Sequence, residues 1–197
     1  MSKDIIENLV LVTCSILEKE VRMLIKEHWQ KCSIISVSSL FHMKPNILNQ
    51  NLKDILQEQI RLGSKIVLIY GDCCPEMLEF GKNSNIVRVA PYNCISLLLG
   101  SEEYSRFIHD GAFFLLPEWT KRWRDIFTDG LGLNKNNASD LLKDMHRFLV
   151  YIDTGIEPVP NKELAECAEY CGLPAIKHPI TLNCLRISIE AAMDKLY

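Results

Sequence analysis

Three of the eight cysteines in this chain occur at or just after the end of a predicted β-strand. They are Cys14 after "NLVLVT", Cys73 in the "YGDCCP" that follows "KIVLI", and Cys94 shortly after "NIVRVA". The carboxyl ends of parallel strands meet at one edge of a sheet, and ligands of α/β proteins bind there. We therefore predict that these three thiols share one site.

Three thiolates suit two kinds of metal centre. Zinc takes four tetrahedral ligands, and a catalytic zinc keeps one position for water or substrate. Three cysteines can also hold a [4Fe-4S] cluster with one iron open to another ligand, although four thiolates are usual. His42, in "LFHMKP", and Cys74 are the candidates for the fourth ligand. Cys14 and Cys94 would also begin helices, where free N–H groups favour the thiolate.

Each thiol also has an interpretation without metal. Cysteine is among the most buried residue types and often serves as a small core residue. We prefer that interpretation for the cysteines outside the shared edge, which are Cys32, Cys167, Cys171 and Cys184. The alternative function for the chain is therefore a small α/β ligand-binding or redox-sensing module without metal.

Apolar runs alternate with segments of helical period along the whole chain. Strands are predicted at 8–13, 33–38, 65–70, 85–90, 112–116, 148–153 and 175–180. Helices are predicted at 15–29, 46–63, 94–108, 117–127, 138–148, 161–172 and 182–196. Continuous rather than alternating apolar strands are typical of parallel sheets that helices cover on both faces. We expect a single α/β domain over residues 1–197, with the strand at 148–153 in the same mostly parallel sheet as the first four.

Composition and motifs exclude several classes of protein. The net charge of −3 and the absence of a dense basic block argue against nucleic-acid binding. No apolar stretch is long enough to cross a membrane, and "MSKDIIENLV" does not resemble a signal peptide, so we expect a cytoplasmic protein. No G-x-G-x-x-G, Walker loop or G-x-S-x-G motif suggests a dinucleotide, nucleotide or hydrolase site.

The residues around the three cysteines also carry a family likeness. Its stretches, in order over residues 8–160, are "VTCSILEKE", "LFHMKPNIL", "YGDC", "NCISLLLGSEEY", "GAFFLLPEW" and "YIDTG". The chain resembles an uncharacterised family of methanogens and anaerobic bacteria that is known only as a domain of unknown function. The chain departs from the pattern at three positions: it has Cys74 and Glu118 where the family has glycine, and Asn93 where the family has aspartate.

The resemblance implies a function that the residues alone do not give. Members of that family often lie near genes for corrinoid-dependent methyltransferases. The resemblance therefore implies an enzyme or accessory factor of anaerobic one-carbon metabolism, with a small-molecule substrate and with corrinoid or methyltransferase proteins as partners. It also brings in Glu20, the glutamate that follows the first cysteine, as a catalytic candidate.

Two aspartates and one loop complete the predictions. Asp72 and Asp153 both follow strands, and each is a candidate general base, partner of His42 or helix cap. The polar segment 129–137, "DGLGLNKNN", has few anchoring residues, so we predict a mobile loop there.

Overall fold

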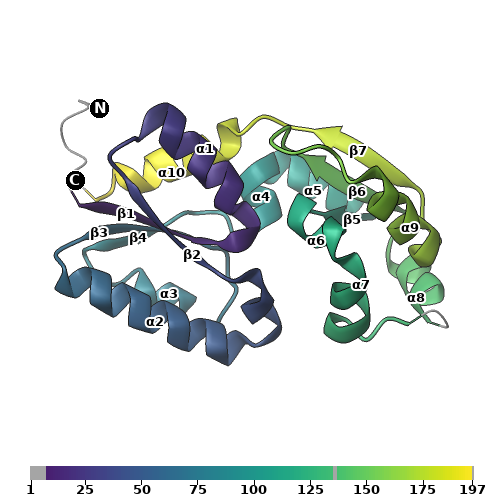
Figure 1. The fold of residues 1–197 in the computed structure, drawn as a ribbon, viewed down its shortest axis with the longest axis horizontal. Coiled ribbons are helices and arrows are strands. Elements are labelled where there is room, and N and C mark those ends of the chain that lie inside the picture. The colour runs from purple at the N-terminus through teal and green to yellow at the C-terminus, as the bar shows by residue number, and fades with distance from the viewer. Residues whose placement is uncertain (1–7, 135–136, 197) are drawn as a thin grey trace. The chain divides into compact units, whose positions relative to one another are not determined.

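The structure is a computed structural model that describes residues 8–134 and 137–196. The chain forms two compact units (Figure 1). The first contains the residues up to Gly100 and those from Leu182 onward, and the second contains Ser101–Thr181. Each unit has its own sheet, and the paired strands of both sheets are parallel. The predicted α/β class with parallel strands is confirmed.

The first unit is built on a four-stranded sheet in the order β2-β1-β3-β4. Its strands are β1 (Leu9–Cys14), β2 (Ser33–Val37), β3 (Lys65–Ile69) and β4 (Ile86–Arg88). Every residue of β1 is buried, whereas the edge strand β2 is partly exposed along most of its length. This difference explains why the sequence of β1 is continuously apolar and that of β2 is interrupted by serines.

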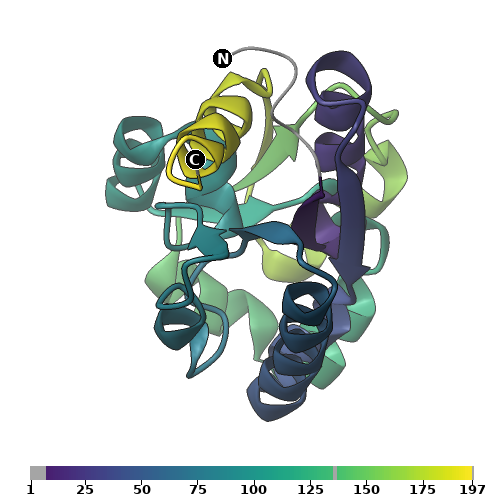
Figure 2. The same cartoon turned by 90° about the vertical axis from the view of Figure 1, so that its left-hand side faces the viewer.

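Helices cover both faces of this sheet, as predicted. One face carries α1 (Glu18–His28) and α10 (Asn183–Met193), and the other carries α2 (Pro45–Arg61) and the short α3 (Met77–Phe80) (Figures 1 and 2). Three further short helices begin near the carboxyl ends of strands: η1 (Ser15–Leu17), η2 (Ser39–Met43) and α4 (Cys94–Leu99).

The second unit has a three-stranded sheet in the order β5-β6-β7. Its strands are β5 (Ala112–Leu115), β6 (Phe148–Asp153) and β7 (Ala175–Pro179). Its helices are α5 (Ser101–His109), α6 (Pro117–Lys121), α7 (Trp123–Asp125), the π-helical η3 (Ile126–Gly130), α8 (Ala138–Met145) and α9 (Asn161–Cys171). Aromatic and aliphatic side chains from these helices and strands, including Trp123, Phe127, Tyr151 and Leu164, form its core.

The expectation of one continuous sheet is wrong, because the strand predicted at 148–153 belongs to the second sheet. The division coincides with Gly100, where the helix predicted over 94–108 ends and α5 begins. Gly100 has φ +81, a left-handed conformation that suits glycine and interrupts a helix.

Two further findings concern the loop and the helices. Residues 135 and 136 of the segment predicted as a mobile loop lie outside the described residues. The neighbouring Leu133 is buried, and its carbonyl accepts a hydrogen bond from the Tyr170 hydroxyl at 3.0 Å, so this part of the segment is better anchored than the sequence indicates.

In the described part of the chain, no helix has the length and apolar character needed to cross a membrane.

Candidate metal centre

The carboxyl edge of the first sheet brings together the residues that the sequence singled out. Thr13 of β1 pairs with Ile69 of β3, so the residues that follow them, Cys14 and Tyr70, lie level with each other on adjacent strands. The chain runs from β1 to β2 on one side, and β3 lies on the other side of β1. This reversal of strand order between β1 and β3 is the position at which open α/β sheets bind ligands.

The loops after β3 and β4 are joined backbone to backbone. The Asp72 N–H donates to the Tyr92 carbonyl oxygen at 2.8 Å. A Cβ atom on Gly71 would overlap that same carbonyl, so only glycine allows the two loops to come this close. The role of Gly71 is to allow this close approach. It holds the segment that contains Cys73 against the one that contains Cys94.

Cys94 is the first residue of α4, as predicted. The side chain of Asn93 caps the helix by accepting from the Ser96 N–H at 2.8 Å, and the Ser96 hydroxyl completes the reciprocal capping box. Asparagine and aspartate are about equally good caps. Asn93 therefore holds Cys94 in place at the helix start.

His42 lies beside Cys14. Its Nδ1 is 3.9 Å from the Cys14 sulfur and 3.0 Å from the carbonyl oxygen of Ser39. A carbonyl oxygen only accepts, so the proton of the neutral ring is on Nδ1 and Nε2 is the basic nitrogen. Metal-bound histidines typically use this arrangement, in which the second ring nitrogen donates to a carbonyl or carboxylate.

Tyr70 follows β3 at this edge of the sheet. Its side chain is fully buried, and its hydroxyl has no hydrogen-bond partner among the described residues. Burial raises the pKa of this phenol, and the nearby thiols, of which Cys14 contributes most, raise it further. The other contributing thiols are those of Cys94, Cys73 and Cys74. All four cysteines at this edge therefore contribute to the raised pKa of one buried phenol.

The thiols are held in the protonated form. Burial raises the pKa of Cys73 to about 11, although the Gly71 backbone and the Arg88 charge partly oppose the shift. Burial also raises the pKa of Cys94 well above its usual range, and the neighbouring Cys14 and Cys73 raise it further. The pKa of Cys74 is raised in the same way. The expected thiolate at a helix start is thus wrong for Cys94, because desolvation outweighs the helix dipole.

Two of the proposed donors are in contact, because the His42 Nδ1 lies 3.9 Å from the Cys14 sulfur. Within residues 8–134 and 137–196, no three histidine, cysteine, aspartate or glutamate side chains are already arranged around a common metal position. The donor set itself fits a soft or borderline ion, because it consists of several thiols and one imidazole.

The three carboxylates named from the sequence have different positions. Asp72 follows β3 with an exposed side chain and forms an ion pair with Arg88 at 2.6 Å. Glu20 is buried in the first turn of α1, where the helix dipole favours a negative charge. Asp153 ends β6 of the second sheet, so its predicted place at the same edge as Asp72 is wrong. Its carboxylate instead accepts from the Gly155 N–H at 3.0 Å.

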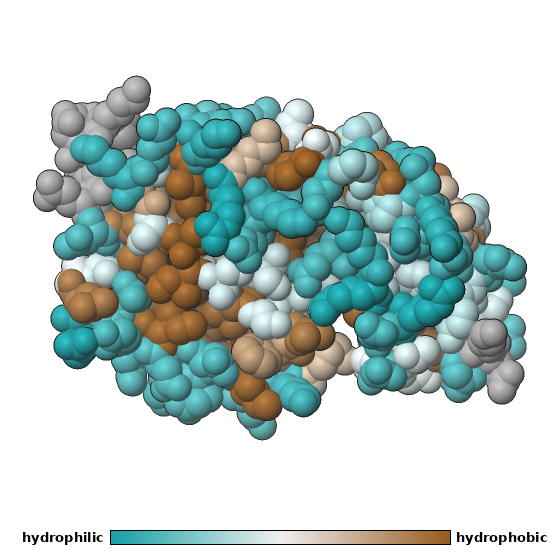
Figure 3. All heavy atoms as spheres, in the orientation of Figure 1, coloured by the Kyte–Doolittle hydropathy of each residue, from teal (hydrophilic) through white to brown (hydrophobic). Residues whose placement is uncertain are grey.

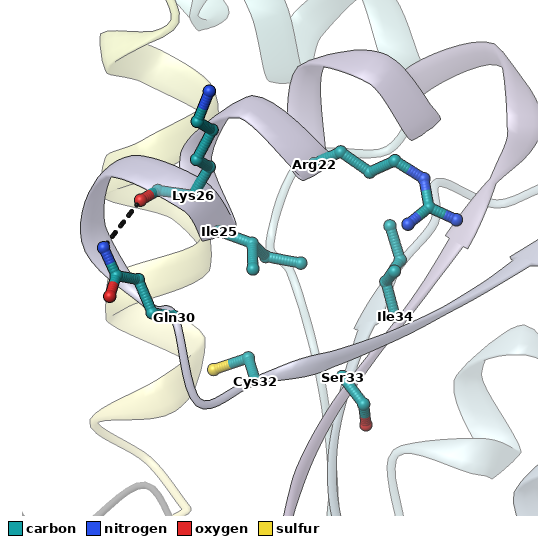
Figure 4. Close-up of a pocket in the computed structure, with 7 residues that line it drawn as sticks. All are labelled: Arg22, Ile25, Lys26, Gln30, Cys32, Ser33 and Ile34. Carbon is teal, nitrogen blue, oxygen red and sulfur yellow. Dashed lines mark hydrogen bonds between the residues drawn. The ribbon is translucent and has the colours of Figure 1, made fainter.

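The remaining cysteines lie elsewhere. Cys167 and Cys171 are fully buried in the core of the second unit, as the core interpretation predicts, and their sulfurs are 3.9 Å apart. Cys32 lines an open pocket of about 330 Å³ between α1 and the start of β2 (Figure 4). Because that pocket is at the amino end of the strand, it is separate from the carboxyl edge.

Three residues of the centre were not given a role from the sequence. Tyr70 and Arg88 continue the runs of β3 and β4, so their sequence context indicates only core or strand positions. Asn49 of α2 bonds twice with Glu76, at 3.0 Å and 3.2 Å, and so fixes the segment after Cys74. The signal that could have identified Tyr70 is a polar aromatic at the end of an otherwise fully apolar strand.

Several apolar side chains close to His42 in the chain reach the surface. Leu40 and Met43 of η2 and Ile47 of α2 are exposed. Figure 3 shows continuous apolar surface over this part of the first unit.

Comparison with known proteins gives one match. The profile of a family described as "Protein of unknown function (DUF1638)" matches residues 37–188. The matched residues include His42, Cys73 and Cys94, whereas Cys14 precedes them. No curated protein matches the chain significantly, and neither does any solved structure.

Proposed function

We propose that this chain, which belongs to the DUF1638 family, is a metalloprotein whose centre lies at the carboxyl edge of the first sheet. Cys14, Cys73 and Cys94 are the proposed thiolate ligands, and His42 is the proposed fourth. The proposed cofactor is zinc or a [4Fe-4S] cluster. The observation that supports the proposal is the placement of Cys14, with the His42 Nδ1 3.9 Å from its sulfur, at the sheet edge where the loops of Cys73 and Cys94 are held together.

The raised thiol pKa values argue against redox sensing at Cys73 and Cys94. A sensor cysteine is exposed and has a low pKa, because the thiolate is the reactive form. Here burial raises the pKa of Cys73 and Cys94, which keeps both thiols protonated and unreactive at neutral pH. A metal ion can displace those protons and stabilise the thiolates, so the same burial is compatible with a metal ligand.

The proposed centre belongs to one-carbon metabolism. A thiolate-bound zinc or an open iron would supply a Lewis acid that activates a small-molecule ligand. The motifs around these cysteines resemble a family of methanogens and anaerobes found near corrinoid-dependent methyltransferase genes. Corrinoid or methyltransferase proteins are therefore the proposed partners, with the chain acting as an enzyme or an accessory factor. Glu20 and Asp72 are the proposed acid–base groups beside the centre.

Metal analysis of protein purified without oxygen tests the proposal. A colourless protein with stoichiometric zinc, or a brown protein absorbing near 400 nm with iron and sulfide, is the expected result. Single Cys14→Ser, Cys73→Ser and Cys94→Ser variants should each lose most of the metal. Cys32→Ser and Cys184→Ser, which remove thiols outside the proposed ligand set, are the matched controls and should keep it.

The absence of a preformed three-donor arrangement in the described residues favours one second candidate. This is a small-ligand module in which the carboxyl-edge cysteines only pack. Protein that remains free of zinc and iron after anaerobic purification and after incubation with either metal would support the module and overturn the metal centre.

A further inference from the structure

The outer edge of β2 is open to pairing with another strand. Among the described strands, β2 pairs only with β1, because it stands at one end of the order β2-β1-β3-β4 (Figures 1 and 2). Proteins usually protect such an edge with charged side chains, with proline or by keeping the strand very short. The sequence of β2, "SIISV", contains neither a charge nor a proline, whereas β4 at the other edge has only three residues and ends in Arg88.

Apolar side chains reach the surface on both faces of this edge. Ile34 points toward α1 and lines the pocket there (Figure 4), and Ser36 lies on the same face, because it forms a hydrogen bond with Glu18 of α1. Ser33 points away from α1, and strand alternation places Ile35 on that side with it. Both isoleucines are partly exposed. An added strand would therefore cover apolar surface as well as satisfy backbone groups.

Charges are distributed unevenly along the same edge. Arg22 and Lys26 line the pocket beside Ile34, whereas Glu18 lies beside Ser36, nearer the other end of the strand. Hydrogen bonds from Ser36 and Arg22 lower the pKa of Glu18, so its carboxylate is charged at neutral pH. A two-fold rotation exchanges the two ends of β2 and brings the positive end of one copy to the negative end of the other. The edge is thus complementary to itself.

We propose that two copies of this chain associate through antiparallel pairing of their β2 strands, with the two-fold axis at Ile35. In this register Ser33 lies opposite Val37 of the second copy. Ile34 lies opposite Ser36, and the two Ile35 side chains meet at the axis. Every residue of β2 is then paired, apolar side chains are covered on both faces, and the two sheets become one continuous sheet.

The same register accounts for the charges on α1. It places Lys26 of each copy near Glu18 of the other, so the interface contains two symmetric ion pairs. Arg22 is already paired with Glu18 of its own chain at 2.7 Å, which leaves Lys26 as the cation for the second copy. The inference is independent of the proposed metal centre, because the cysteines at the carboxyl edge take no part in it.

Sedimentation equilibrium of the full chain in reducing buffer tests the dimer. We expect a mass of twice the 22.6 kDa of one chain. Ile35→Lys should raise the dissociation constant of the dimer about tenfold or more, because it removes the central apolar pair and places like charges opposite each other. Thermal unfolding of the same preparation shows whether the variant is folded.

A charge exchange on α1 tests the register without changing β2. Lys26→Glu should raise the dissociation constant several-fold, because two carboxylates then face each other across the interface. The double variant Glu18→Lys/Lys26→Glu should recover most of the lost affinity, because it restores both ion pairs with their signs exchanged. Since these side chains lie at the surface or close to it, the test remains informative even where Ile35→Lys does not fold.

Ile176→Lys is the matched control. Ile176 is 42% exposed on β7, an edge strand of the second sheet that also contains Lys177 and Pro179. This variant should keep the dissociation constant of the wild type. A wild-type protein that remains monomeric would overturn the proposal and leave the β2 edge to a strand of a different protein. A dimer that neither Ile35→Lys nor Lys26→Glu weakens would overturn β2 as its interface.

Discussion

The Nδ1 atom of His42 lies 3.9 Å from the Cys14 sulfur and 3.0 Å from the Ser39 carbonyl oxygen. The imidazole is therefore held against the first of the proposed ligands by its own short helix. Because the carbonyl fixes the proton on Nδ1, the basic nitrogen of the neutral ring is Nε2. A histidine oriented in this way needs no change of tautomer to bind a metal.

We expect His42→Gln to weaken zinc binding by at least about tenfold, because the change removes the proposed fourth ligand. Isothermal titration or chelator competition under anaerobic conditions measures the affinity. His28→Gln is the control, since His28 is half-exposed at the end of α1. Equal affinities for the two variants would remove His42 from the site and leave Cys74 as the fourth ligand.

Gly71→Ala should destabilise the protein by about 3 kcal/mol, which is near the upper end for overpacking, because the new Cβ meets the Tyr92 backbone and not a flexible side chain. Urea unfolding of the metal-free protein measures the change. The loss should be accompanied by a lower metal content, since the same contact holds the loops of Cys73 and Cys94 together.

Gly81→Ala is the matched control for this prediction. Its Cβ would lie 3.7 Å from the nearest atom, an ordinary van der Waals contact. The substitution should change the free energy of unfolding by less than about 1 kcal/mol. If Gly71→Ala were equally mild, the close approach of the two loops would not be a constraint on the site.

Much of the first unit could be predicted from its sequence. The strands of this sheet are apolar runs bounded by helical segments, so their carboxyl ends and the cysteines that follow them could be placed at one edge. The partners of individual atoms could not be predicted in this way. Whether the Tyr70 hydroxyl has a hydrogen-bond partner, or the Asp72 carboxylate an ion-pair partner, depends on loops that are distant in the sequence and adjacent in the fold.

The division of the chain was missed for a specific physical reason. Gly100 lies inside a stretch whose apolar residues continue at helical spacing on both sides, and a single glycine in a helix costs only about 1 kcal/mol. The sequence therefore indicated one helix across it. In the structure its φ of +81 ends α4 there, and the second sheet, with Asp153, follows.

The metal-free protein should lose stability as the pH rises above 9, and part of that loss should depend on Cys32. Burial raises the pKa of Cys32 from 9 to about 11. In the window between these values the unfolded chain releases the proton while the folded chain retains it, so folding becomes less favourable. Ionisation of this one thiol should lower the free energy of unfolding by about 1 kcal/mol at pH 10 relative to pH 8.

Urea unfolding of the wild type and of Cys32→Ser at pH 8, 9 and 10 measures this dependence. The variant lacks the titrating thiol, so its stability should fall less steeply over the same range. Parallel curves for the two proteins would show that Cys32 ionises in the folded state as readily as in the unfolded one.

The Cys167 and Cys171 pair provides the last prediction. Their sulfurs lie 3.9 Å apart on one face of α9, at a spacing that could also hold a metal. Both are fully buried in the core of the second unit, whereas the proposed ligands belong to the first. The double variant Cys167→Ala/Cys171→Ala should therefore lose about 2 kcal/mol of stability through poorer packing and keep its full metal content. Metal analysis and urea unfolding of the same preparation measure both quantities. A folded double variant that had lost its metal would place the metal site in the second unit, because packing alone gives these two thiols no reason to affect ligands at Cys14, Cys73 and Cys94.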